Sequence, residues 1–278
     1  MRLLIHTGGT IGMVAGPTGL VPATGCVEAA AGGRARVVSF DPLVDSANIG
    51  SDHWNRMLDL IEAEAGPVVI THGTDTMTYT AAALSQALAG WGHPVILTGS
   101  MLPLGQGGDA EANLDLALGA TPAPGVWLAF AGRLLPADGL IKSHSRMADA
   151  FRSRSPSGLD GAVVEPWQSR RFAARRLGVL TVAPGVVPEA LGAALDHLDG
   201  AVLRVFGTGT IPALPALAQV LGDAVANGKL LRAVSTCENG GLLPGTYAAG
   251  QGLWDAGVQN GGLDTVEAAL IRLWLALS

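Results

Sequence analysis

Two short segments near the N-terminus combine glycine with side chains that could do chemistry. Residues 7–12 read TGGTIG, and the adjacent glycines permit a sharp turn and a close approach of a substrate to the backbone. Such a turn would leave Thr10 pointing into a cleft. Residues 71–76 read THGTDT and place the hydroxyl of Thr74 beside the carboxylate of Asp75 at the expected start of a helix.

A third segment, residues 48–52, repeats the hydroxyl–carboxylate pair at Ser51 and Asp52. If the three segments converge, they form a small polar pocket suited to a zwitterion. Carboxylates would meet an ammonium group, and hydroxyls with backbone N–H groups would meet a carboxylate.

Each segment also has a simpler interpretation. Residues 7–12 could cradle a phosphate, or they could form a tight turn whose Thr10 caps a helix. Either hydroxyl–carboxylate pair could merely cap the helix that follows it. Within the second segment, His72 is expected to be a structural hydrogen-bonding residue rather than a base.

The elements that must position these segments follow from the apolar pattern. Four short apolar runs are typical of strands buried in a parallel sheet: residues 3–5, 67–71, 94–98 and 126–131. Apolar residues at helical spacing predict helices between them, over residues 54–61 and 77–84. Ligands of open α/β sheets bind at the carboxyl ends of the strands, where the hydroxyl-rich segments begin. The sequence therefore predicts an α/β fold whose larger N-terminal domain is a parallel sheet with helices on both faces.

The pattern weakens after about residue 158 and then resumes. Apolar runs that predict strands recur at residues 179–182, 201–206 and 231–236, separated by Ala/Leu-rich helical segments. We therefore expect an N-terminal domain over residues 1–165, and a linker with a smaller C-terminal α/β domain over residues 166–278. The linker contains two arginine pairs, expected to be solvated or to lie at a subunit contact: Arg170 with Arg171, and Arg175 with Arg176.

The composition narrows the class of protein. The chain has 278 residues, 49% apolar and only 14% charged, with a net charge of −6, so a nucleic-acid partner is not expected. No uncharged apolar run reaches the roughly 18 residues of a membrane span, and the N-terminus lacks the pattern of a signal peptide, which favours the cytoplasm. Cys26 and Cys237 have neither disulfide-framework nor zinc-ligand spacing, so we expect no metal and no cofactor.

The residues at 5–12 and 71–77 resemble the two signature segments of the bacterial-type L-asparaginase family, in the right order. The chain is most similar to the cytoplasmic, type I branch of that family. The resemblance covers most of the chain and extends to several further positions: residues 48–52, residues 98–101, Asp109, Asn113, Lys142, residues 247–250 and residues 264–268.

The resemblance implies hydrolysis of L-asparagine to L-aspartate and ammonia. Thr10 would be the nucleophile that forms an acyl-enzyme. Thr74, Asp75 and a partly desolvated Lys142 would form a proton-handling relay. Backbone N–H groups around Thr10 and Thr74 would stabilise the oxyanion. The implied substrate-binding residues hold the α-carboxylate, the α-ammonium and neighbouring groups of the amino acid: Gly50, Ser51, Asp52, Gly73, Thr74 and Asp75.

One position departs from the family pattern. The family usually has a tyrosine on the loop after the first motif, set to activate the threonine, and Leu20 aligns with it here. The chain has only Tyr79 and Tyr247, and Tyr79 follows the second motif, where it is poorly placed to substitute. The activation of Thr10 could then come from Thr74 with Lys142 or from another loop, or turnover could be slow or altered in substrate.

Three functions are consistent with these residues. The first is asparagine hydrolysis, with weak glutaminase activity because one methylene changes pocket fit by only ~1–3 kcal/mol. The second is an amino-acid-binding or sensing relative that has lost turnover, which Leu20 favours. The third, an amidase subunit acting on aminoacyl-tRNA, is disfavoured by the acidic charge. By resemblance, the assembly is expected to be a homodimer or homotetramer.

Overall fold

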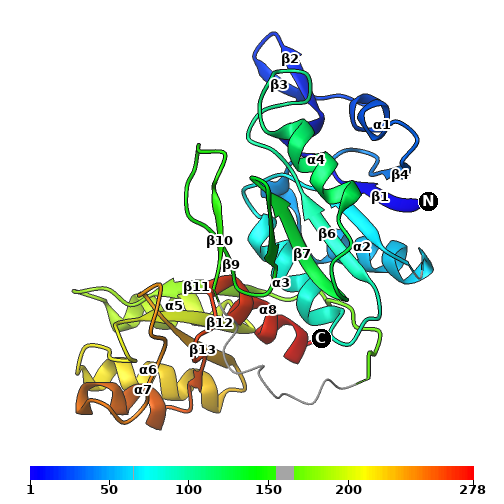
Figure 1. Ribbon diagram of the computed structural model, residues 1–278. Coiled ribbons are helices and arrows are strands. Elements are labelled where there is room, and N and C mark those ends of the chain that lie inside the picture. Colours follow the sequence, from blue (N-terminus) through cyan, green and yellow to red (C-terminus); the bar gives the residue numbers. More distant parts are fainter. Residues whose placement is uncertain (65, 155–165) are drawn as a thin grey trace. The chain divides into compact units, whose positions relative to one another are not determined.

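The computed structural model describes residues 1–64, 66–154 and 166–278 (Figure 1). The described chain divides into two compact units, one with residues 1–154 and 166–172 and the other with residues 173–278. The predicted boundary after residue 165 falls at the end of a stretch, 155–165, that lies outside the described residues. Within the described residues, no helix has the length and apolar character needed to cross a bilayer.

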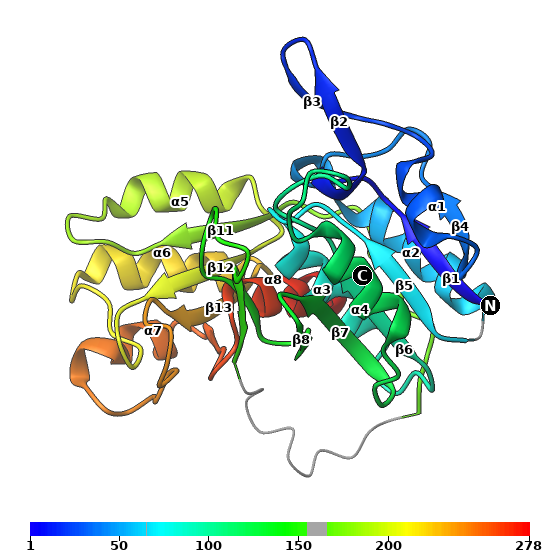
Figure 2. The same cartoon turned by 45° about the horizontal axis from the view of Figure 1, so that its top comes forward.

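The first unit is built on a six-stranded sheet in the order β4-β1-β5-β6-β7-β8. All neighbouring pairs are parallel except β7 with β8. The six strands are β1 (Arg2–His6), β4 (Ala35–Ser39), β5 (Val68–Thr71), β6 (Pro94–Thr98), β7 (Gly125–Phe130) and β8 (Arg133–Pro136). Two antiparallel hairpins complete the unit: β2 (Met13–Gly16) with β3 (Gly19–Pro22), and β9 (Leu140–Lys142) with β10 (Phe151–Ser153). Figure 2 shows the β2–β3 hairpin extending away from the sheet of this unit.

Helices cover both faces of this sheet because its central strands are apolar on both sides. Leu4, Val69 and Ile96 pack with α1 (Cys26–Ala31) and α4 (Ala110–Gly119) in one core. On the other side, α2 (Ser51–Glu64) packs against β1 and α3 (Met77–Ala87). Burying a large aliphatic side chain contributes ~1.5–3 kcal/mol, so each face supplies a substantial share of the stability.

The second unit has a four-stranded parallel sheet in the order β11-β12-β13-β14. Helices α5 and α6 pack on one face through Leu191, Leu195, Leu217 and Leu221, and α8 packs on the other face. The elements are β11 (Leu177–Thr181), α5 (Pro188–Asp196), β12 (Gly200–Val205), α6 (Pro215–Ala226), β13 (Leu230–Ser235), α7 (Gln251–Asp255), β14 (Gln259–Asn260) and α8 (Val266–Ala276).

The predicted fold class is confirmed: a larger α/β unit with a parallel sheet precedes a smaller α/β unit. Every apolar run that predicted a strand is a strand, within one or two residues at each end. Among the elements that the sequence did not reveal are β4, β8, the two hairpins and the helices α1 and α4.

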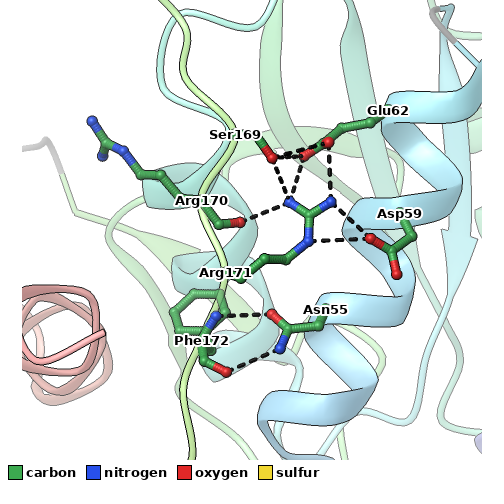
Figure 3. A network of polar contacts seen from close by, with 7 residues as sticks. All are labelled: Asn55, Asp59, Glu62, Ser169, Arg170, Arg171 and Phe172. Atoms are coloured by element: carbon green, nitrogen blue, oxygen red, sulfur yellow. Dashed lines mark hydrogen bonds and ion pairs between the residues drawn. The ribbon is translucent and has the colours of Figure 1, made fainter.

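Residues 166–172, expected to be part of a solvated linker, are fastened to α2 of the first unit (Figure 3). We call residues 169–172 the strap. The Arg171 guanidinium donates to Asp59 at 2.7 Å and to Glu62 at 2.6 Å, and only 34% of its side chain is exposed. The next residue, Phe172, is held through its backbone. Its N–H donates to the Asn55 side chain at 2.8 Å, and its carbonyl accepts from the same side chain at 2.9 Å. Arg171 is thus paired with two carboxylates rather than solvated.

Arg171→Leu is expected to lower the free energy of unfolding by about 1–2 kcal/mol, since a networked guanidinium with two carboxylate partners is worth more than an isolated surface pair. Urea unfolding followed by tryptophan fluorescence would measure this loss of stability. Trp167, close to the strap, packs edge to face on Trp91 with the ring centres 4.7 Å apart, so its emission should report on unfolding there. Arg175→Leu is the matched control, since among the described residues the Arg175 charge acts on Asp199 only at a distance, and Arg176 is the residue that pairs with that carboxylate. Equal losses in the two variants would contradict the role of the Arg171 network.

Candidate active site

The strand order places the two threonine motifs side by side. From β1 the chain goes outward to β4 and then returns to β5 on the other side of β1, so the winding reverses between β1 and β5. Such a switch point opens a crevice at the carboxyl ends of the two strands. The first motif follows His6 at the end of β1, and the second follows Thr71 at the end of β5, its register partner.

The two motifs touch through glycine backbone. Gly9 has a φ of 89°, and a Cβ built on it would lie 2.5 Å from the Gly73 nitrogen. The turn is tied further by Thr7, whose N–H and hydroxyl both donate to the Thr71 carbonyl, at 3.1 and 2.9 Å. Only glycine allows this approach, because any side chain at residue 9 would occupy the place of the second motif. The contact joins the loop that carries Thr10 to the loop that carries Thr74.

Gly9→Ala is expected to destabilise the protein by about 3 kcal/mol or more, because a left-handed φ costs on the order of 1 kcal/mol and the clash with Gly73 adds to it. Gly105→Ala is the matched control: Gly105 has a φ of 80° with no atom within 4 Å of the added Cβ. Chemical denaturation of both variants measures the difference. Similar losses would mean that the close approach of the two motifs contributes nothing.

Thr10 begins a short 3-10 turn, Thr10–Gly12, and its side chain is half-buried. The turn is closed by the Gly12 N–H, which donates to the Gly9 carbonyl at 3.1 Å. A second loop holds it in place, because the Leu104 N–H donates to the Ile11 carbonyl at 3.2 Å. Thr10 is therefore presented by a turn with fixed backbone at the carboxyl edge of the sheet.

Thr74, Asp75 and Lys142 form the polar cluster that the sequence predicted. The Lys142 Nζ donates to the Thr74 hydroxyl oxygen at 3.0 Å and to the Asp75 carboxylate at 2.6 Å. The Lys142 side chain is 17% exposed, whereas the Asp75 side chain is 73% exposed. Because the ammonium donates to the Thr74 oxygen, the Thr74 hydroxyl proton is free to point elsewhere, as a proton relay requires.

Lys142 reaches this cluster from the end of β9, which is separated from Thr74 by 68 residues of sequence. The β9–β10 pairing sets Lys142 opposite Phe151. The buried Phe151 ring packs edge to face on Phe130 of the main sheet, with the ring centres 4.9 Å apart. The α3 helix, which follows the second motif, also packs against β9. Apolar packing on both sides thus holds the ammonium beside Thr74.

Ser46, which the sequence analysis did not single out, also lies at this edge. It is 3% exposed, and its Oγ lies 2.5 Å from the position that a Cβ on Gly73 would take. Its carbonyl accepts from the Thr76 hydroxyl at 2.6 Å, and the preceding loop is tied to the first motif by the Val44 N–H, which donates to the Thr7 carbonyl. Ser46 is therefore a candidate binding residue beside both motifs.

Gly50, Ser51 and Asp52, predicted to bind substrate, lie at the beginning of α2. The contacts of Gly50 are local, since its N–H donates to His53 Nδ1 at 3.2 Å and its carbonyl accepts from the Trp54 N–H at 3.1 Å. Within the described residues, no hydrogen bond joins these three residues to Gly73, Thr74 or Lys142. Their role stays a prediction, and Ser46 is the hydroxyl that the structure places against Gly73.

Other residues of the family pattern support loops. The Asp109 carboxylate accepts from the Met101 N–H at 2.9 Å, and Asn113 donates to the Gly99 carbonyl at 2.9 Å, so the loop after β6 is fixed. In the second unit, Asp264 accepts from Arg232 at 2.7 Å, and Thr265 caps α8. Asp109, Asn113 and Asp264 therefore stabilise loops and helix ends within their own units.

His72 is fully buried inside the second motif, and burial lowers its pKa to about 4. Its Nδ1 lies 2.6 Å from the Gly73 carbonyl and its Nε2 lies 2.9 Å from the Thr80 hydroxyl. A ring with both nitrogens occupied and a depressed pKa is neutral at physiological pH. This agrees with the expectation that His72 is structural rather than a base.

Leu20, the residue aligned with the usual tyrosine, lies on β3 opposite Ala15 and is 45% exposed. Of the two tyrosines, Tyr79 lies within α3, and Tyr247 belongs to the second unit. Residues 1–64, 66–154 and 166–278 contain no group of three His, Cys, Asp or Glu side chains arranged to hold a metal ion. The polar side chains described beside the second motif are thus the hydroxyls of Thr74 and Ser46, the Lys142 ammonium and the Asp75 carboxylate.

Family models of asparaginases match both units of the chain. A family model described as "Asparaginase, N-terminal" matches residues 3–165, and one described as "Glutaminase/Asparaginase C-terminal domain" matches residues 176–278. Together they cover nearly the whole chain.

Individual relatives match over similar lengths. L-asparaginase 1 of Escherichia coli (strain K12) is 31% identical, over 98% of this chain and 90% of that protein. L-asparaginase of Thermococcus kodakarensis is 31% identical, over 100% of this chain and 93% of that protein. The crystal structure of L-asparaginase I from Vibrio cholerae superimposes with a TM-score of 0.86 at 33% identity, over 100% of this chain and 92% of that one.

Proposed function

The chain belongs to the asparaginase family, and we propose that this L-asparaginase converts L-asparagine into L-aspartate and ammonia with Thr10 as its nucleophile. The observation that supports the proposal is the approach of Gly9 to Gly73, because it joins the loop that carries Thr10 to the loop that carries Thr74, whose hydroxyl accepts from Lys142.

In the first half of the reaction, the Thr10 oxygen bonds to the side-chain amide carbon of asparagine. The Thr10 proton passes to the Thr74 oxygen while the Thr74 hydroxyl passes its own proton to the leaving nitrogen, and the Lys142 ammonium donates to the same oxygen throughout. The carbon–nitrogen bond then breaks, ammonia leaves, and an aspartyl ester remains on Thr10. Backbone N–H groups of residues 10 and 74 stabilise the oxyanion that forms in between.

In the second half, water adds to the ester carbon and passes one proton to the same relay. The bond to Thr10 breaks, the Thr10 oxygen recovers a proton, and aspartate leaves. Asp75 meets the α-ammonium of the substrate, since its carboxylate is exposed at the site. The α-carboxylate and its neighbours are bound by Gly50, Ser51, Asp52 and Gly73, and we add Ser46 to this set because its Oγ lies against Gly73.

Ammonia release from L-asparagine by the purified protein tests this function, with L-glutamine run in parallel. We expect turnover of asparagine and weak turnover of glutamine, whose extra methylene changes pocket fit by only ~1–3 kcal/mol. The alternative, an amino-acid-binding protein without turnover, rests on Leu20. The L-asparaginases that this chain resembles over nearly its full length favour the enzyme. Calorimetric binding of aspartate without ammonia release from asparagine would establish the binding protein instead.

Leu20→Tyr is expected to raise kcat by about 10-fold, because a phenol on this hairpin could accept the Thr10 proton. General acid–base groups raise reaction rates by at least about 10²-fold. Leu20→Phe is the matched control, since it adds the ring without the hydroxyl. Steady-state kinetics on asparagine compare the two variants. Equal rates would mean that the hairpin does not bring residue 20 to Thr10 during turnover.

Two further expectations stay predictions for this enzyme: a location in the cytoplasm, and assembly as a homodimer or homotetramer. Sedimentation equilibrium measures the second directly. A monomer that turns over asparagine would contradict it.

A further inference from the structure

Three buried side chains join α2 and α3 to the second motif by hydrogen bonds whose direction is fixed. The indole N–H of Trp54 lies 3.0 Å from the Thr80 hydroxyl oxygen, and it can only donate. The Gly73 carbonyl, 2.6 Å from His72 Nδ1, can only accept, so the neutral ring has its proton on Nδ1 and Nε2 accepts from the Thr80 hydroxyl at 2.9 Å. His72 therefore donates its Nδ1 proton to the Gly73 carbonyl.

This last bond determines the orientation of the Gly73–Thr74 peptide. The peptide is trans, so its N–H points away from its carbonyl. Because the Gly73 carbonyl points to the buried His72 ring, the Thr74 N–H points to the opposite side. No hydrogen bond of the described residues uses that N–H. A backbone donor held in this way, at the motif that meets Gly9, is suited to an oxyanion.

The strap contacts this group of side chains through Phe172. The Phe172 ring packs edge to face on Trp54 with the ring centres 5.2 Å apart. Asn55, one residue after Trp54, brackets the Phe172 backbone by bonding to both its N–H and its carbonyl. The indole thus has its body fixed by the strap and its N–H fixed by Thr80.

We propose that Trp54, Thr80 and His72 are positioning residues that aim the Thr74 N–H at the oxyanion of the reaction, with Phe172 of the strap fixing the indole. The proposal rests on the function proposed above and adds to it residues that touch neither substrate nor nucleophile. Its consequence is that a contact made by the segment between the two family domains supports the rate of the chemical step.

Thr80→Val tests the proposal because valine keeps the shape of threonine and removes the hydroxyl that both neighbours use. We expect kcat for asparagine to fall about 10-fold with KM within about twofold, since a misdirected oxyanion donor costs less than the 10²–10³ of a deleted one. Thr80→Ser, which keeps the hydroxyl, is expected to retain kcat within about twofold. Equal kcat values in wild type and Thr80→Val would overturn the proposal.

Nitrogen NMR of protein labelled with ¹⁵N-histidine gives a readout that needs no variant to fold. We expect the wild-type His72 ring to be neutral between pH 6 and 8 with the proton on Nδ1, and the ¹⁵N chemical shift of Nε2 to move in Thr80→Val, because Nε2 loses the hydrogen bond from the Thr80 hydroxyl. A wild-type ring protonated on Nε2 would overturn the hydrogen-bond order. These outcomes are separate from failure of the proposed function, which would appear as turnover that survives loss of Thr10.

Discussion

Thr10→Ala is expected to lower the turnover of asparagine by at least about 10⁴-fold, since loss of the nucleophile in other hydrolases costs on the order of 10⁶ in kcat. No other described hydroxyl has the same setting. Thr10 follows a glycine that packs on the second motif, and its turn is held by two neighbouring loops. Binding of aspartate is expected to survive the substitution, because the binding groups lie on the other segments.

The matched control for Thr10→Ala is Thr121→Ala, an exposed threonine after α4 that should leave kcat unchanged. Ammonia release under saturating asparagine compares the two variants with wild type. A Thr10→Ala enzyme with a rate within about 100-fold of wild type would remove Thr10 from the chemistry, because that loss is within the range of a general acid–base or positioning residue.

Lys142→Met is expected to lower kcat by about 10³-fold, within the 10²–10⁴ range of a general acid–base group. Methionine retains most of the apolar stem that packs in the first unit and removes only the ammonium group. Thr74 then loses the donor that directs its hydroxyl, and Asp75 loses its cation. The predicted change is mainly in kcat, because the relay acts on the proton rather than on the bound amino acid.

The other lysine of the chain provides the control for Lys142→Met. Lys229 donates to the Leu198 carbonyl at 2.8 Å within the second unit, so Lys229→Met should change stability rather than kcat. Steady-state kinetics over a range of asparagine concentrations separate kcat from KM. A pure rise in KM for Lys142→Met would assign the lysine to substrate binding and contradict the relay.

The main strands could be predicted because strands buried on both faces appear as unbroken apolar runs, as in residues 67–71 and 94–98. The edge strand β4 was missed for the same reason. It reads ARVVS, with two of its five positions polar, because one side of an edge strand meets solvent. The β2–β3 hairpin was missed because its two strands have only four residues each and are largely exposed, so they form no buried apolar run.

The site followed the same rule. Thr10 and Thr74 could be found because each follows a recognisable strand, and strand ends collect ligand-binding residues in this fold class. Ser46 lies in the loop after β4, so missing the strand meant missing the hydroxyl that packs against Gly73. The strap could not be predicted from the sequence, since two arginines shortly after Pro166 look like part of a linker until Asp59 and Glu62 are seen opposite Arg171.

The most direct test of the central claim is to locate the acyl group. Wild-type enzyme mixed with excess asparagine and quenched in acid within milliseconds would be digested, and its peptides analysed by mass spectrometry. The account predicts an aspartyl ester on Thr10, in the peptide that contains residues 7–12, and none in the Thr10→Ala enzyme. An ester on Thr74 instead would contradict the account and make the second motif the source of the nucleophile.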